Sequence, residues 1–175
     1  MDTSPGYTLD SGWEFGSPYG DNTTYGGADA AYTGTNLYDT NLDGGMHTTG
    51  YLRSTVFDCS EYEDVQLSFM GWFSVLTGYA ATVEVSNDNV NWTTLSSTSG
   101  VWTSSWQEYN FDISNYADEQ ATVYVRWGHV ATTGGSNYSG MSVDDVKIIG
   151  VKKTTAVSSP TNSIVPVLMM LLLSK

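Results

Sequence analysis

Two adjacent aspartates in the last strand-like segment of the chain are the residues most suggestive of chemistry. In the run 140–149 (GMSVDDVKII), Val143 and Ile148 have the spacing of buried strand positions, and Asp144 and Asp145 lie between them. Aspartate has poor strand propensity, and a half-buried carboxylate is costly unless a cation or several N–H donors satisfy it. The pair therefore predicts either a small structural metal site or a corner in which one aspartate is solvated and the other accepts turn amides.

A second acidic motif lies earlier in the chain. Asp39, Asn41 and Asp43, followed by Gly44, form the pattern D-x-N-x-D-G, which is the first half of an EF-hand calcium loop. The twelfth position of such a loop is Gly50 here instead of a bidentate glutamate, and no amphipathic helix flanks the motif. The motif does not predict a true EF-hand. It predicts a loop held by Ca²⁺ or a plain polar turn.

Signals for catalysis are weak. His47 and His129 are far apart in the sequence, and the chain has no G-x-S-x-G or H-E-x-x-H motif. Cys59 follows an aspartate, so it does not lie in an electropositive setting. Glu84 and Glu108 each lie on the outward-facing side of an expected strand, where we expect solvated side chains. Glycoside hydrolysis needs two carboxylates at a set distance from each other, and a sequence does not give that distance. We therefore predict that the chain is not an enzyme.

Aromatic residues make up 13% of the chain and suggest a different chemistry, because Trp and Tyr rings commonly stack on sugar rings. Trp127 is spaced by two residues from Val125 and by four from Val123, so it lies on the same side of the expected strand and is predicted to be in the core. Trp102 and Trp106 flank a short Thr-Ser-Ser run, and Tyr79 and Tyr138 lie in turns. These four residues are candidates for an exposed ligand-binding platform, with rim packing as the alternative.

The elements that must position these residues are strands. Apolar and polar residues alternate with period two from residue 50 to residue 150, and no segment keeps an apolar pattern at helical spacing. Turn-forming clusters separate the strands. The expected strands cover residues 12–16, 51–57, 65–73, 81–86, 92–96, 106–113, 122–127 and 140–149. The pattern predicts an all-β fold, a two-sheet antiparallel jelly-roll sandwich of about eight strands.

Composition suggests the domain boundaries. We expect residues 1–10 to be disordered or a linker, residues 11–150 to form the jelly-roll domain, and residues 151–163 to form a polar linker. Residues 164–175 are an apolar tail, shorter than the about 20 residues of a membrane helix. The tail is a truncated anchor, a sorting signal, or a strand donated to a neighbouring subunit. The first residues do not resemble a signal peptide, so an exported protein would be longer than this chain.

The charge balance bears on the possible partners. The chain has 19 acidic and 6 basic residues, for a net charge of −13, so it offers no basic face for nucleic acid and disfavours anionic membrane surfaces. Charged residues are only 14% of the chain, and Gly, Thr, Ser, Asn and Tyr are abundant, which is typical of β-rich extracellular domains. Cys59 has no disulfide partner within the chain, and we expect a buried, unreactive thiol.

Nine short motifs in a fixed order carry a resemblance to a known family. They are 12–18 (GWEFGSP), 34–38, 51–54, 57–60, 65–69, 83–88, 106–114, 123–127 and 143–146 (VDDV), and they span about residues 11–150. In this order they resemble the MAM-like jelly-roll modules of secreted bacterial peptidases, including the immune inhibitor A type, and of large surface proteins. The resemblance implies a non-catalytic accessory domain, often with a structural Ca²⁺ between its first and last strands. Glu14 and the pair Asp144 and Asp145 match the ligand positions, whereas the acidic residue expected near the third strand is missing from 71–79.

Two classes of function compete. The first is a non-catalytic, calcium-stabilised binding or adhesion module, extracellular or on the cell surface, whose partner is a glycan or a protein. The tail could then attach it to a membrane or cell envelope. The second is a structural subunit that polymerises through its C-terminal apolar strand, and a hydrolase is third. Glycan binding, filaments that disappear on deletion of 164–173, and substrate turnover would distinguish the three.

Overall fold

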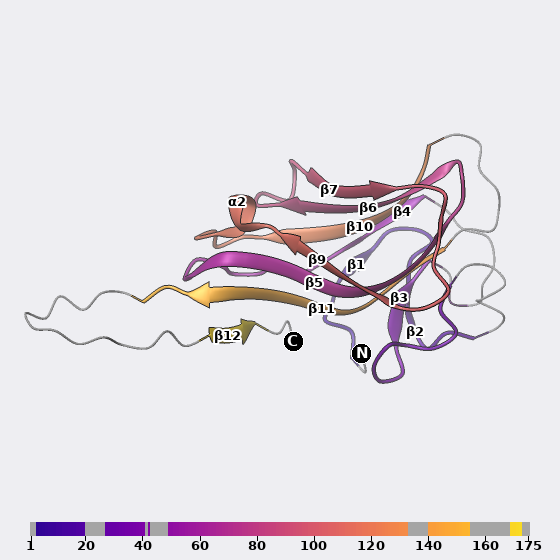
Figure 1. Ribbon diagram of the computed structural model, residues 1–175, viewed down its shortest axis with the longest axis horizontal. Helices are drawn as coiled ribbons and strands as arrows, with labels where there is room; N and C mark the ends of the chain where they lie inside the picture. Colours follow the sequence, from indigo (N-terminus) through magenta and orange to yellow (C-terminus); the bar gives the residue numbers. More distant parts are fainter. Residues whose placement is uncertain are drawn as a thin grey trace, which may run out of the picture.

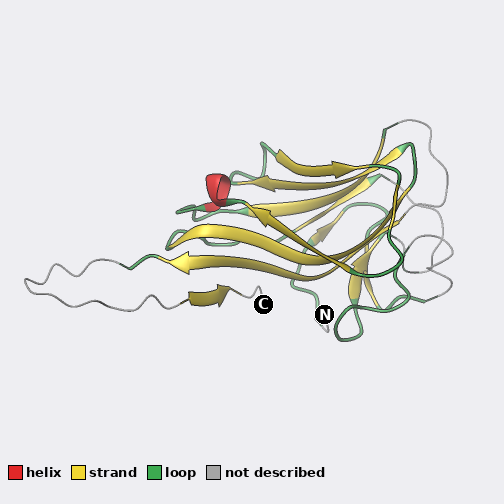
Figure 2. Cartoon of the chain, viewed as in Figure 1, coloured by secondary structure: helices red, strands yellow, loops and turns green. Residues whose placement is uncertain are grey.

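The computed structural model describes residues 3–19, 27–40, 42, 49–132 and 140–154, together with the backbone of residues 169–172. Within these ranges the chain forms two antiparallel sheets, as the period-two pattern predicts. Strands dominate the described chain, and one short helix, α2 (Ser114–Ala117), interrupts them (Figure 2). The prediction of an all-β, two-sheet jelly-roll sandwich is confirmed.

The two sheets are built from strands far apart in the sequence (Figure 1). The five-stranded sheet has the order β1 (Thr8–Leu9), β4 (Gly50–Arg53), β10 (Tyr124–Ala131), β6 (Tyr79–Ser86) and β7 (Thr93–Thr98). The seven-stranded sheet has the order β2 (Glu14–Gly16), β3 (Leu37–Asp39), β11 (Gly140–Lys152), β5 (Tyr62–Val75) and β8 (Val101–Trp102), with β9 (Gln107–Asp112) also paired to β5 and β12 (Met169–Leu172) to β11. The strands outnumber the about eight expected because several are too short to give a period-two signal.

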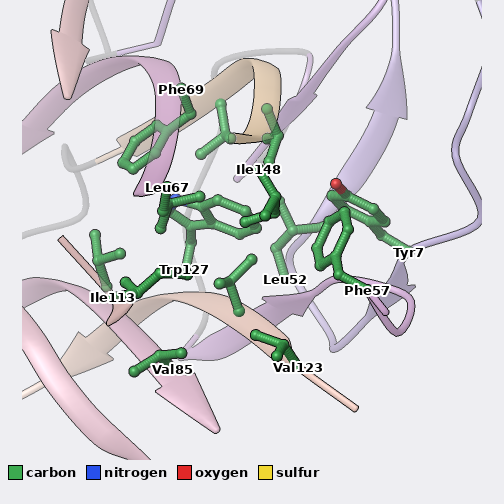
Figure 3. Close-up of a cluster of buried hydrophobic side chains, with 14 of the residues drawn as sticks. Tyr7, Leu52, Phe57, Leu67, Phe69, Val85, Ile113, Val123, Trp127 and Ile148 are labelled. Carbon is green, nitrogen blue, oxygen red and sulfur yellow. The ribbon is translucent and has the colours of Figure 1, made fainter. Parts of the chain in front are cut away.

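The hydrophobic core lies between the sheets. Trp127 of β10 has no exposed surface, and its ring meets Phe69 of β5 edge-on, with 5.3 Å between the ring centroids. Figure 3 shows Trp127 at the centre of the surrounding core side chains, so its predicted burial is confirmed. Truncating a buried aromatic side chain of this kind costs about 3–5 kcal/mol. Because strand side chains alternate, every second residue lies on an outer face of the sandwich, where the candidate sites are found.

The domain begins earlier in the chain than expected. β1 pairs with β4, and Tyr7 is only 7% exposed. The Tyr7 ring stacks on Tyr38, with centroids 5.2 Å apart, and lies 6.2 Å from the ring of Trp127. The expectation that residues 1–10 are disordered or a linker is therefore wrong for residues 7–9. A single two-residue strand carries too little alternation to be recognised in the sequence.

The end of the domain lies close to its expected place. β11 continues to Lys152, two residues past the expected boundary at 150. The backbone of β12 pairs antiparallel with β11, from Ile148 opposite Leu172 to Val151 opposite Met169, and the two strands lie side by side in Figure 1. The rest of the predicted linker and tail beyond residue 154 lies outside the described residues. No helix within the described ranges is long and apolar enough to cross a membrane.

Candidate functional site

The acidic pair lies on a β-bulge of β11. The register between β11 and β5 shifts between Asp144 and Lys147, and Asp145 has a φ of 48°, in the left-handed region that few non-glycine residues adopt. Asp144 is fully buried. Its Oδ2 accepts hydrogen bonds from the backbone N–H groups of Tyr32, at 2.9 Å, and Thr33, at 3.1 Å, and its Oδ1 accepts one from the N–H of Asp145, at 2.7 Å. Asp144 thus accepts turn amides, as one of the two predicted arrangements requires, whereas Asp145 is half-buried instead of solvated.

Asp145 supports the same turn from a half-buried position. Its Oδ1 accepts a hydrogen bond of 2.6 Å from the hydroxyl group of Thr33. Burial raises the pKa of Asp144, and the N–H groups of Thr33 and Asp145 lower it in part. Together the two carboxylates attach the segment 27–36 to the outer face of the seven-stranded sheet.

A second carboxylate pair lies where β3 runs between β2 and β11. Asp39 is directly opposite Glu14 on one side and Ser142 on the other. Its Oδ2 accepts a hydrogen bond of 2.7 Å from the Ser142 hydroxyl, whereas its Oδ1 is buried and has no hydrogen-bond partner among the described residues. Burial raises the pKa of Asp39 well above its usual value, against the lowering effects of the Ser142 hydroxyl and the Thr40 N–H, and the Glu14 carboxylate adds a smaller increase. Glu14 also accepts a hydrogen bond from the N–H of Leu42, at 3.0 Å.

This second pair fits the chemistry of a hard cation. Ca²⁺ takes 6–8 oxygen ligands from carboxylates, carbonyls and water. Asp39 Oδ1 is a buried acceptor that has no hydrogen-bond partner among the described residues, and Asp39 is the register partner of Glu14. A cation bound between the two carboxylates would satisfy this oxygen. Among the described residues, no three His, Cys, Asp or Glu side chains are placed to hold a metal together. Asp144 already accepts N–H groups with both oxygens, and the predicted ligands Asn41 and Asp43 lie outside the described residues.

The segment 27–36 is part of the long glycine-rich region between the first two expected strands. The N–H of Ala28 donates a hydrogen bond of 3.1 Å to the Ser142 hydroxyl, which itself donates to Asp39. Below the segment lies a small hydrophobic cluster, separate from the main core. Its members are Ala28, Leu37 and Leu42, with Ala31, Trp72 and Trp106 packed against them. The outer face of the seven-stranded sheet therefore orders this segment.

Two of the four predicted platform residues lie on the outer face of the seven-stranded sheet. The Trp106 ring meets both Trp72 and Tyr32 edge-on, each at a centroid distance of 6.2 Å, and its Nε1–H donates to the carbonyl oxygen of Ala30 at 3.2 Å. Trp102 is directly opposite Ser74 of β5, which is on the same face as Trp72. Trp102 is 51% exposed and Tyr32 is 50% exposed. We refer to Tyr32, Trp72, Trp102 and Trp106 as the aromatic face.

The other two predicted platform residues are not part of this face. Tyr79 begins β6 and stacks on the ring of His129, with 4.6 Å between the centroids, at the margin of the main core. His129 itself is fully buried. Tyr138 lies outside the described residues. Conversely, Tyr32 was missed, because nothing in the sequence around it indicates that Asp144 fixes its backbone beside Trp106.

A further cluster on the outer face of the five-stranded sheet was also missed. Glu84 was expected to be a solvated strand residue, but it is only 7% exposed and forms an ion pair with Arg126. The guanidinium carbon of Arg126 lies 4.1 Å from the ring centroid of Tyr51 and 4.2 Å from that of Trp92. The expectation for Glu84 is therefore wrong. The period-two pattern shows that a side chain points away from the core, but it does not show which other side chains cover it. Glu108 is exposed, as expected.

Comparison with known proteins finds similarity only at the level of structure. No family model matches the chain, and no curated protein matches it. The chain is similar to the carbohydrate-binding module TmCBM61 in complex with β-1,4-galactotriose, with a TM-score of 0.53 and 10% identity over 82% of this chain and 86% of that chain. It is also similar to the K1 cleaved adhesin domain of Lys-gingipain from Porphyromonas gingivalis W83, with a TM-score of 0.51 and 14% identity over 83% and 94% of the two chains.

A third similar structure is the CBM22-1 xylan-binding domain of Xyn10C from Paenibacillus barcinonensis. It has a TM-score of 0.51 and 17% identity, over 88% of this chain and 91% of that chain. Identities this low establish a shared fold and no more. The structural neighbours of the chain are thus jelly-roll carbohydrate-binding modules and adhesin domains, and the MAM-like resemblance stays a prediction.

Proposed function

We propose that this chain is a non-catalytic, extracellular module that binds glycans through the aromatic face and is stabilised by Ca²⁺. The observation that carries the proposal is the pair of half-exposed rings, Trp102 and Tyr32, on one outer face. Large exposed aromatic surfaces are uncommon unless they bind something. The similar structures named as a galactotriose complex and a xylan-binding domain support a saccharide as the ligand.

The aromatic face is held in place before any ligand arrives. Tyr32 is fixed through its backbone N–H to Asp144, and Trp106 is fixed by its hydrogen bond to Ala30 and by the ring of Trp72. Rings that are already ordered lose little conformational entropy on binding, so more of the stacking energy appears as affinity. This rigidity suits a binding module that has no catalytic step to perform.

The proposed Ca²⁺ would be held by Asp39 Oδ1 and the carboxylate of Glu14, with carbonyl or water oxygens completing the shell. When bound, the cation would offset the repulsion between these two opposed carboxylates and give the buried oxygen of Asp39 a partner. Because β3 lies between β2 and β11, the site would join the first strands of the sheet to the last. It would also stabilise the base of the segment 27–36 through Ser142.

The test of glycan binding is a panel of neutral polysaccharides that includes β-1,4-galactan and xylan, measured by affinity electrophoresis and calorimetry. Replacing Trp102 or Tyr32 with Ala should weaken binding about ten-fold or more, since buried aromatic anchors dominate such interfaces. Val90→Ala is the matched control, because Val90 is 76% exposed in the turn between β6 and β7, away from this face. Binding that is unchanged in both aromatic variants, or absent throughout the panel, would contradict the proposal.

The pairing of β12 with β11 favours a second candidate function, a structural subunit. Residues Ile148–Val151 present an edge to which Met169–Leu172 of the same chain adds. The equivalent segment of another copy could add to the same edge and link subunits into filaments. Electron microscopy of the full chain and of a chain lacking residues 164–173 tests this function. Only the full chain should form filaments, and a monomeric full chain would exclude it.

A further inference from the structure

The outer face of the five-stranded sheet gathers both arginines of the chain. Arg53 of β4 and Arg126 of β10 are direct register partners, so their side chains lie next to each other on the same face. Like charges placed opposite each other destabilise a sheet. In a chain with a net charge of −13, the two arginines could have been distributed among many carboxylates. Their concentration at one point therefore calls for a physical explanation.

Arg126 is held in a fixed orientation. Its guanidinium lies between the rings of Tyr51 and Trp92, and its Nε–H donates to Glu84 Oε2. The ring of Tyr51 can lie against the sheet because residue 128 beneath it is glycine, where a Cβ would come within 2.7 Å of a ring carbon. Cation–π contacts and one ion pair thus fix the planar guanidinium, and its terminal N–H groups donate to no other residue that the structure describes.

Arg53 is charged but not neutralised. Its guanidinium carbon lies 5.8 Å from the ring centroid of Trp92, and it forms no ion pair with any residue that the structure describes. Its Nε is buried and has no hydrogen-bond partner within the same ranges. A buried donor without a partner costs about 1–3 kcal/mol, and more when the group is charged. The carboxylate of Glu84 pairs with Arg126, and the nearby carboxylate of Asp10 accepts the backbone N–H of Tyr51 and forms no ion pair with Arg53.

We propose that this arginine face, made of Arg53, Arg126, Tyr51, Trp92 and Glu84, is a second ligand site that binds the carboxylate of an acidic sugar. The choice of a sugar depends on the proposed function, and the choice of a carboxylate rests on the charge of the face. A guanidinium group matches a planar carboxylate with two parallel N–H···O bonds, and the guanidinium of Arg53 has no ion-pair partner among the described residues. Nucleic acid needs an extended basic face for its run of phosphates, which a chain with six basic residues does not supply, whereas one sugar carboxylate needs only these two guanidinium groups.

The test uses polygalacturonate, its fully methyl-esterified form, dextran sulfate and β-1,4-galactan as probes in calorimetry and affinity electrophoresis. The wild-type protein should bind polygalacturonate, and esterification should abolish that binding, because the ester removes the charge and keeps the sugar. Arg53→Gln should weaken binding about ten-fold or more, given the strength of charged hydrogen bonds. Lys152→Gln is the matched control, since it removes the same unit charge from an exposed ion pair with Glu61 and should bind like the wild type.

A double variant, Arg126→Gln with Glu84→Gln, removes the second guanidinium without leaving a buried carboxylate unpaired, and it should also lose binding. Three results would overturn the inference. They are equal binding of polygalacturonate and its methyl ester, binding of dextran sulfate without binding of polygalacturonate, and equal loss of polygalacturonate binding in Arg53→Gln and Lys152→Gln. Trp102→Ala separates the two sites, because it should weaken binding to galactan and leave binding to polygalacturonate unchanged. A wild-type protein that binds galactan but not polygalacturonate would refute this inference, and one that binds polygalacturonate but not galactan would refute the proposed function.

Discussion

Replacing Asp39 with Asn tests the proposed cation site most directly. The side chain is 1% exposed and has one oxygen bonded to Ser142 and one with no described partner. Asn has nearly the same shape, carries no charge, and can place an N–H group toward the carboxylate of Glu14. Without metal, Asp39→Asn should therefore be more stable than the wild type at neutral pH by about 1–3 kcal/mol, the cost of an unsatisfied buried polar group.

Calcium should reverse this order. A ligand that binds only the folded state at a hundred times its dissociation constant adds about 2.7 kcal/mol, and a chain of this size gains roughly 2–4 °C in Tm per kcal/mol. The wild-type Tm should therefore rise by roughly 5–11 °C with saturating Ca²⁺, and that of Asp39→Asn should not. Glu14→Gln should lose the same response, whereas Asp145→Asn, on the neighbouring strand, should keep most of it.

The pH dependence gives an independent check of the same site. Because burial raises the pKa of Asp39 above its usual value of 3.8, the folded state holds this proton more tightly than the unfolded chain does. The stabilising contribution is present below the unfolded pKa and is lost as the pH rises through the folded pKa. In chelator, mild acidification from neutral pH should thus stabilise the wild type more than Asp39→Asn. Melting curves in calcium and in chelator measure all of these effects. An unchanged wild-type midpoint in calcium would refute the reasoning.

Two further predictions concern residues whose partners are described. Asp144→Asn should destabilise the protein by about 2–4 kcal/mol in urea unfolding, because it weakens charged hydrogen bonds to the turn at Tyr32. Asp145→Asn should cost less than about 1 kcal/mol. Similar losses for both variants would show that Asp144 does not hold this turn. Cys59 is fully buried, and burial, with a smaller effect of Asp58, raises the pKa of its thiol to about 11. It should therefore react with a thiol reagent at neutral pH only after unfolding in guanidinium, and rapid reaction of the native protein would contradict its placement.

The sequence alone was sufficient to predict the class of fold and many of the residues of the hydrophobic core. Alternation with period two shows which side of a strand each residue occupies, because successive side chains point to opposite faces. That rule placed Trp127 in the core correctly. Trp102 and Trp106 lie on one outer face, and their role in binding a glycan stays a prediction. The same rule could not detect β1, because a two-residue strand has no period to detect.

The cross-strand neighbours were decided only by the tertiary structure. The period-two pattern showed that Glu84 points outward, but only the register of β6, β10 and β4 brings Arg126 beside Glu84 and Arg53 beside Arg126. Likewise, the sequence could suggest that the acidic pair accepts turn amides, but it could not show that the turn lies more than a hundred residues earlier, at Tyr32. Alternation is a local property fixed by backbone geometry, whereas register depends on how distant strands fit together in the whole sandwich.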